Sequence, residues 1–270
     1  MTRKLTKLLF AFAIMLQSNI SFATPVQLAI VIDDMGNSFH DLRALRLPTA
    51  VTFSILPYTP HAKNISSIAT KQGREVLLHV PMQAKAHNEK LGKGALMLSM
   101  QEGAFKAELK KAINYLPDAT GVNNHMGSAL TEHVKPMSWA MEILNKQGLY
   151  FLDSRTTTQT IAESTAQISG TPALRRHVFL DNIKTNKAME EQFQRAIKLG
   201  ADHPSVVIIA HPYPETLRFL ARKFKQKNTN IELVSLQELL PQSARLAMAK
   251  KRNELQQANN TITDSNKNTQ

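Results

Sequence analysis

The sequence contains no cysteine, and this absence limits how the protein is stabilised and what it can bind. A chain without thiols forms no disulfides and offers no thiolate ligand to a metal. Any metal site must therefore be built from histidine and carboxylate side chains.

Long hydrophobic runs are absent as well. The apolar run near the N-terminus, residues 8–16, holds nine residues, far fewer than the ~20 that span a bilayer. Basic residues precede it, and the small residues Ser21 and Ala23 suit a cleavage site, which is the layout of a secretory signal. We expect cleavage after Ala23 to remove residues 1–23, which leaves a periplasmic or secreted protein with no stable membrane span. An uncleaved anchor is the alternative.

Acidic residues are few relative to basic ones, since 33 Lys and Arg face 21 Asp and Glu for a net charge of +12. Such an excess can serve nucleic-acid binding, but an exported protein rarely meets nucleic acid, so we expect no such partner. A solvated basic face is the simplest interpretation, and an envelope surface or an anionic polymer is the alternative.

Residues 24–240 are expected to form one domain, because no internal break or repeat divides them. After this domain the sequence becomes polar. Within the tail 241–270, residues 244–257 are compatible with a helix, and residues 259–270 are rich in Asn, Thr and Ser. We predict a partly helical tail that ends in disorder.

Short β-type runs alternate with longer amphipathic segments inside the domain, which indicates parallel strands joined by helical crossovers. The predicted strands are residues 27–32, 50–56, 75–80, 121–123, 149–152, 173–180, 205–210 and 231–234. This pattern predicts a distorted (β/α) barrel of about seven or eight strands. An open doubly wound sheet is the alternative.

Polar side chains stand at the ends of most of these strands, where the apolar part finishes. They are Asp33, Asp34, His79, Asn124, His125, Asp153, Asp181 and His211. Because parallel strands point their carboxyl ends toward the same mouth, we expect these side chains to converge there.

Each of these residues also has a purely structural interpretation. Asp153 and Asp181 could cap the helices that follow, and His79 could be a hydrogen-bonded core histidine. Asp33 and Asp34 could cap a turn, but two charges after five apolar residues are costly to bury without a partner. A metal or catalytic role is therefore favoured for the aspartate pair.

Two histidines and one carboxylate with an open coordination position form a common catalytic site for a divalent cation such as zinc. Such a cation lowers the pKa of bound water and polarises a carbonyl oxygen. A second carboxylate can accept the proton of the water, and a separate histidine can protonate the leaving group. The strand ends contain all of these groups.

Several motifs resemble those of a known family. They are residues 30–36, 75–82, 121–128, 151–154 and 211–214. In these strings the chain resembles the NodB-like polysaccharide deacetylases of the carbohydrate esterase type, and within them a divergent branch found in bacterial envelopes. The resemblance covers roughly residues 25–240 and implies a distorted (β/α) barrel.

The resemblance also implies roles for individual residues. Asp33 would be the general base, Asp34 a ligand of a divalent metal such as zinc, and His211 the general acid. The family's two metal histidines stand four residues apart, but here His79 is followed four residues later by Gln83. His125, from the next strand end, is the candidate replacement. The family's usual Arg-containing substrate motif has no evident match.

These implied roles lead to a functional hypothesis with alternatives. The leading one is an exported metal-dependent hydrolase that removes an acetyl or other N-acyl group from an envelope or extracellular polysaccharide. Asn124, Asp153, Asp181 and Tyr213 would bind substrate or support the site. A non-catalytic module that binds a glycan or an envelope protein is the first alternative. Metal-dependent hydrolysis of a phosphate or another ester is the second.

Overall fold

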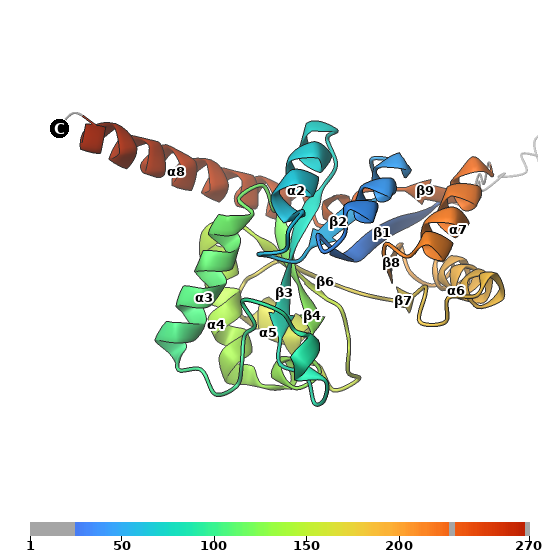
Figure 1. The fold of residues 1–270 in the computed structure, drawn as a ribbon, viewed down its shortest axis with the longest axis horizontal. Helices are drawn as coiled ribbons and strands as arrows, with labels where there is room; N and C mark the ends of the chain where they lie inside the picture. Colours follow the sequence, from blue (N-terminus) through green and yellow to red (C-terminus); the bar gives the residue numbers. More distant parts are fainter. Residues whose placement is uncertain (1–24, 227–229, 268–270) are drawn as a thin grey trace, which may run out of the picture.

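A curled parallel sheet forms the centre of this computed structural model, which describes residues 25–226 and 230–267 (Figure 1). Its nine strands are β1 (Val26–Met35), β2 (Thr52–Ile55), β3 (Val76–Met82), β4 (Gly121–Met126), β5 (Tyr150–Asp153), β6 (Ala173–Arg175), β7 (Val178–Phe179), β8 (Ser205–Ala210) and β9 (Ile231–Leu233). The predicted signal peptide lies outside the described residues.

Helices connect most successive strands, as is usual for parallel pairing. The α-helices are α2 (Ala62–Lys71), α3 (Glu102–Tyr115), α4 (Val134–Gln147), α5 (Ala162–Ile168), α6 (Asn186–Leu199), α7 (Pro214–Lys225) and α8 (Gln242–Lys267). Short 3-10 segments add η1 (Phe39–Arg46), η2 (Asn88–Lys90), η3 (Leu130–Glu132) and η4 (Leu236–Leu239). No helix among the described residues has the length and apolar character needed to cross a membrane.

The strand order is β6-β5-β4-β3-β2-β1-β8-β7, and β9 also pairs with β1. Strands β1 to β6 are therefore spatial neighbours in sequence order, without the reversal of an open doubly wound sheet. The sheet curls into a half-barrel surrounded by helices (Figure 1). The predicted distorted (β/α) barrel is confirmed.

One predicted strand, residues 173–180, is two strands in the structure. Its halves, β6 and β7, lie at opposite ends of the strand order. Between them Arg176 donates its backbone N–H to Asp153 O, and His177 donates its own to Val207 O. The segment therefore crosses the gap between the two edges of the curled sheet, a contact that no local sequence pattern encodes.

The core has two layers because side chains alternate along each strand. On β1, Ile30 and Ile32 pack under the surrounding helices, whereas Ala29 and Val31 belong to a smaller cluster with residues from β3, β5 and β8. Burying one such isoleucine contributes roughly 1.5–3 kcal/mol. The layers hold the strand ends, and hence the site, at fixed positions.

The C-terminal tail departs from expectation. Helix α8 runs through most of the segment that was predicted to be disordered, and it projects away from the barrel (Figure 1). No proline or glycine interrupts it, and Ala, Lys, Glu and Gln favour helix. Its first half docks on α4, where Lys251 Nζ donates to Asn145 O and Arg252 donates to Gly148 O. Met248, a residue of α8, is buried in the smaller of the two core clusters.

Candidate metal and catalytic site

The carboxyl end of β1 turns sharply and presents two adjacent carboxylates. Asp34 has a left-handed backbone with φ of 58°, which is costly for a residue other than glycine. Gly36 follows with φ of 118°, and a Cβ there would lie 2.1 Å from Thr59 Oγ1. The Gly36 N–H donates to Asp41 Oδ2 at 2.8 Å. This braced turn directs Asp33 and Asp34 into a cavity at the open end of the barrel.

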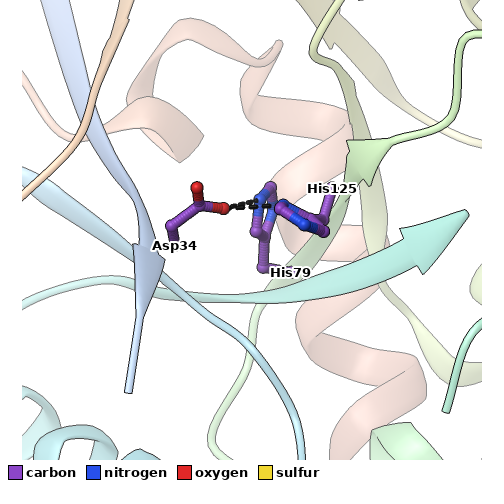
Figure 2. Close-up of side chains that lie close together, drawn as sticks. All are labelled: Asp34, His79 and His125. Carbon is purple, nitrogen blue, oxygen red and sulfur yellow. Dashed lines mark hydrogen bonds and ion pairs between the residues drawn. The ribbon is translucent and has the colours of Figure 1, made fainter. Parts of the chain in front are cut away.

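Three possible metal ligands meet at this end of the barrel (Figure 2). Asp34 Oδ1 lies 3.0 Å from His79 Nε2 and 2.7 Å from His125 Nδ1. Ligands about 2.1 Å from a tetrahedral ion are about 3.4 Å apart, so only a slight opening of this cluster is needed. One carboxylate and two imidazoles form a donor set that suits zinc. The residues therefore fit the metal that the sequence predicts.

The second histidine ligand comes from a neighbouring strand rather than from the local motif. In the register of β3 and β4, Pro81 stands opposite His125. His79, two residues before Pro81, therefore points to the same face of the sheet as His125, and both imidazoles reach Asp34 Oδ1. Gln83, at the place of the missing histidine, instead accepts a hydrogen bond from the Leu98 N–H at 2.7 Å. Gln83 thus holds the loop after β3 in place, and His125 is the candidate for the second histidine ligand.

The charges in this cluster favour binding a cation. Burial alone would lower the pKa of His79, but Asp33 and Asp34 raise it to about 9. Burial would likewise raise the pKa of Asp34, but hydrogen bonds with His125 and His79 hold it well below its usual range. An ionised carboxylate faces a protonated imidazole, and a metal ion would replace the proton on Nε2.

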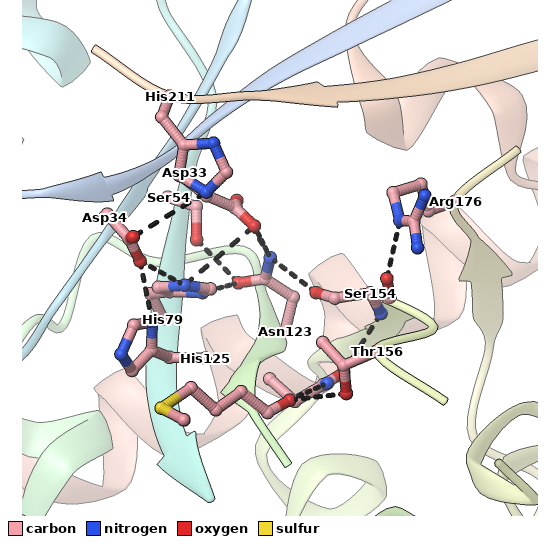
Figure 3. A network of polar contacts seen from close by, with 12 residues as sticks. Asp33, Asp34, Ser54, His79, Asn123, His125, Ser154, Thr156, Arg176 and His211 are labelled. Atoms are coloured by element: carbon pink, nitrogen blue, oxygen red, sulfur yellow. Dashed lines mark hydrogen bonds and ion pairs between the residues drawn. The ribbon is translucent and has the colours of Figure 1, made fainter. Parts of the chain in front are cut away.

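Asn123 on β4 links the two halves of the site, although the sequence did not single it out. Its Nδ2 donates to Asp33 Oδ1 at 3.0 Å, and its Oδ1 accepts from Ser54 Oγ at 2.5 Å (Figure 3). Because Nδ2 faces a carboxylate, Oδ1 must face His79 Nδ1, 2.7 Å away. His79 Nδ1 therefore carries a hydrogen, which leaves Nε2 as the ligand atom. Its position directly before Asn124 and His125 at the same strand end was the available signal.

Asp33 stands beside the ligands without belonging to the described three-residue cluster. Its side chain is almost fully buried, and its Oδ2 lies 3.9 Å from His79 Nε2. Burial raises the pKa of Asp33, and the nearby His79 and His211 offset this effect only in part. A carboxylate with a raised pKa next to a metal site is suited to accept a proton.

His211 enters the site from the end of β8 and is oriented by Asp181. Its Nδ1 lies 3.0 Å from Asp181 Oδ1, and its backbone N–H donates to Asp181 Oδ2 at 2.7 Å. Thr216 Oγ1 also donates to Asp181 Oδ2. Burial would lower the pKa of His211, but Asp181 and Asp34 raise it. His211 Nε2, 3.6 Å from Asp34 Oδ2, is thus a proton donor aimed at the metal ligands.

Asn124 and Asp153 support the loop that follows β5. Asn124 Oδ1 accepts from the Ser154 N–H at 2.9 Å, and Asp153 Oδ1 accepts from the Arg155 N–H at 2.8 Å. Asp153 Oδ2 accepts from Thr160 Oγ1. The structure brings both predicted residues to the mouth, where they shape the loop behind the ligands.

Tyr213 lies beside His211 with its ring already in contact on two sides. Lys184 Nζ is 3.5 Å from the ring centroid, and the imidazole of His211 is 5.5 Å from it. Tyr213 lines a smaller pocket next to the main cavity. Tyr213 therefore lies at the rim of the cavity beside His211, the expected general acid. Its two ring contacts reduce the ring surface on which a sugar could stack.

A cavity of about 340 Å³ is lined by the three candidate metal ligands and by Asp33 and His211. Besides the predicted site residues, its wall includes two arginines, Arg155 and Arg176, and the ring of Phe179. The sequence pattern did not indicate these residues. Arg155 follows β5, and Arg176 lies in the segment that crosses the gap between the two edges of the sheet. Only the closed fold brings both arginines to the cavity.

Comparison with known proteins agrees with this architecture. The family model of the divergent polysaccharide deacetylases matches residues 30–240. The chain therefore belongs to this family, as its motifs predicted.

Two bacterial relatives match nearly the same region. The uncharacterized protein YibQ of Escherichia coli K12 is 37% identical over 234 residues, which cover 85% of this chain and 72% of YibQ. An uncharacterized protein of Haemophilus influenzae Rd is 35% identical over 229 residues, covering 84% of this chain and 81% of that protein.

A solved structure shares the fold. The uncharacterized protein ATU2773 of Agrobacterium tumefaciens C58 superposes with a TM-score of 0.77 at 21% sequence identity, covering 81% of this chain and 91% of that chain. At this level of identity the likeness concerns the fold alone.

Proposed function

We propose that the protein is an exported metal-dependent hydrolase that removes an acetyl or other N-acyl group from a polysaccharide of the cell envelope or its surroundings. Family membership and fold support hydrolysis of a carbon–nitrogen bond. The observation that carries the proposal is the meeting of Asp33, His211 and a three-ligand cluster around one cavity. Export rests on the predicted signal peptide.

The metal would be held by Asp34, His79 and His125. When bound, a divalent ion such as zinc supplies Lewis acidity toward a carbonyl oxygen and makes water more acidic. The hydrogen bond of His79 Nδ1 to Asn123 keeps the ligand nitrogen directed at the ion.

The two protons of the reaction are assigned to Asp33 and His211. Asp33 accepts a proton from the water whose oxygen bonds to the acyl carbon, and its raised pKa makes it a competent base. As the carbon–nitrogen bond breaks, His211 donates its Nε2 proton to the departing nitrogen. Asp181 stabilises the protonated imidazole through Nδ1. The products are a free amine and a carboxylic acid.

The missing local histidine was the main argument for a non-catalytic binding module. His125 Nδ1 lies 2.7 Å from Asp34 Oδ1, which supports His125 as the replacement for the missing histidine. A binding module would also have no need for an almost fully buried carboxylate beside these ligands. The arrangement therefore favours the hydrolase.

The test combines metal content with release of acetate. We expect zinc-loaded wild-type protein to hold one ion per chain, and His79→Ala and His125→Ala to lose it, whereas the exposed His133→Ala keeps it. Acetate should be released from N-acetylated glycan fragments by the wild type and not by Asp33→Asn. Unchanged metal content in both ligand variants would overturn the site. Glycan binding without acetate release would instead indicate the binding module.

A further inference from the structure

The wall of the cavity at the site carries two cationic side chains that the proposed chemistry leaves without a role. Arg155 and Arg176 line the same cavity as the ligand cluster. Figure 3 shows Arg176 beyond Ser154, across the site from Asp34. Among the residues described by the structure, neither guanidinium forms an ion pair with a carboxylate.

Arg176 is mounted rigidly. Its Nε donates to Ser154 O at 2.6 Å and its Nη2 donates to Arg155 O at 2.7 Å. The guanidinium also lies 5.2 Å from the ring centroid of Phe179, whose other neighbour is the imidazole of His211, 5.3 Å away. One aromatic ring therefore separates this cation from the expected general acid.

Arg155 is presented by a strained turn. Its φ of 47° is left-handed, and the hydrogen bond from its N–H to Asp153 Oδ1 holds that conformation. Such strain persists where the surrounding structure enforces it, and it is typical of functional sites. The two guanidinium groups lie close enough to interact: burial, and to a smaller extent Arg155, lower the pKa of Arg176, while Asp33 and Asp153 offset part of this effect.

The charges of the cavity do not balance without a further anion. Its carboxylates are Asp33 and Asp34, and a divalent metal ion would neutralise both. Asp153, buried behind the wall, attracts both guanidinium groups and contributes one further negative charge. One negative charge then faces two guanidinium charges, so one positive charge remains without a balancing carboxylate.

We propose that Arg155 and Arg176 bind an anionic oxygen group of the substrate, a carboxylate or a phosphate, so that the preferred substrate is an acidic N-acylated glycan. Guanidinium groups pair with such anions through paired hydrogen bonds. The acyl group would lie at the ligand cluster and the anion at the arginines, at opposite sides of one cavity. This inference rests on the proposed function, because it assigns the substrate class of the same site.

The test compares three disaccharides that differ in one group. N-acetylglucosamine is linked to glucose, to glucuronic acid or to glucose 6-phosphate, and binding to the zinc-loaded protein is measured by calorimetry. We expect at least one acidic disaccharide to bind about tenfold or more tightly than the neutral one, since charge-assisted hydrogen bonds are strong. Which acid binds identifies the anion.

The variants are Arg155→Gln and Arg176→Gln, with the exposed neighbour Arg175→Gln as the matched control. Each of the two cavity variants should lose most of the preference for the acidic disaccharide, whereas the control keeps it. Arg176→Gln also removes hydrogen bonds to the loop, so Arg176→Lys, which retains the charge, should restore part of the preference. Equal binding of the neutral and both acidic disaccharides to the wild type would overturn the inference, and so would a preference that survives in both glutamine variants.

The two proposals fail in different ways. Tighter binding of an acidic disaccharide without acetate release would support the anion site and contradict the proposed hydrolase activity. Acetate release from the neutral disaccharide at an equal rate, with equal binding, would keep the hydrolase and remove the anion site.

Discussion

The two ends of the barrel both bury charged side chains, but they arrange them in opposite ways. At the amino end of the strands, Glu75 accepts hydrogen bonds from Thr120 Oγ1 at 2.9 Å and Tyr150 OH at 2.8 Å on one oxygen. Its other oxygen accepts from Thr52 Oγ1 and from the Gln237 N–H. Neutral donors thus form hydrogen bonds with both carboxylate oxygens of Glu75, and η4 covers this carboxylate.

Arg74, next to Glu75, is used in the same way. Its guanidinium donates to the carbonyl oxygens of Leu47, Pro48 and Val51, at 2.7 to 2.9 Å. These bonds fasten the segment before β2 to the start of β3. At this end, buried charge joins elements of the fold together through neutral hydrogen-bonding partners.

At the carboxyl end, by contrast, carboxylates face each other and histidines across a cavity. Backbone strain follows the same division. Within the described part of the chain, five residues other than glycine are left-handed, and they end or follow β1, β2, β3, β4 and β5 in turn: Asp34, Tyr58, His87, Met126 and Arg155. The connections before β3, β5 and β6 use Gly73, Gly148 and Gly170 for this conformation, at little cost. Buried charge alone therefore does not mark a functional site, but unbalanced charge combined with strain does.

The largest effect that would separate the two ends is expected for Asp33→Asn. Removing the proton acceptor should lower kcat about 1,000-fold, while the thermal midpoint stays unchanged or rises, because the cost of burying the Asp33 charge is relieved. Acetate release and thermal unfolding check this, with Glu75→Gln as the comparison that retains activity. A marked loss of thermal stability in Asp33→Asn would place this carboxylate with the structural ones.

A smaller effect is expected for Asn123→Ala. Without the acceptor for His79 Nδ1, the imidazole loses its orientation, and zinc affinity should fall about 10- to 100-fold. Competition with a chelator measures this affinity. Asn124→Ala is the matched control, because its amide bonds to Ser154 and Met126 rather than to a ligand. Equal losses in both variants would show that general loosening, and not orientation, is responsible.

For the amino end, Glu75→Gln should reduce the free energy of unfolding by about 2 kcal/mol, since the Gln237 N–H loses its acceptor, and should leave zinc affinity unchanged. Burial raises the pKa of Glu75 above 4.5. The folded state therefore binds this proton more tightly than the unfolded state, and stability falls as pH rises from 4.5 through the folded-state pKa. Urea unfolding across this range should show the slope in the wild type and not in Glu75→Gln.

The smallest expected effect is the pH dependence of metal binding. The pKa of His79 is about 9, so zinc must displace its proton at neutral pH. Affinity should fall by up to tenfold for each pH unit below 9. Calorimetry in buffers of different ionisation enthalpy should show about one proton released per zinc ion at neutral pH. Zinc binding without proton release would argue against His79 as a ligand.

Local patterns predicted much of this architecture because they depend on neighbouring residues only. Alternating β-type and amphipathic segments are properties of short windows, and they identified the parallel barrel. The same logic placed Asp33, Asp34 and His211 at strand ends, where parallel topology alone brings them to one mouth. In the tail, α8 continues to Lys267, beyond the helix-compatible stretch 244–257.

What remained depends on pairing between distant strands. The sequence by itself determined the barrel, its polar mouth and the family motifs, since each follows from periodicity and residue type. Only the tertiary structure decided that His125 lies beside Asp34 and His79, that Asn123 joins Asp33 to His79, and that Arg176 reaches the cavity. The register of β3 with β4 and the crossing between β6 and β7 set these contacts, and register is a property of the whole folded sheet.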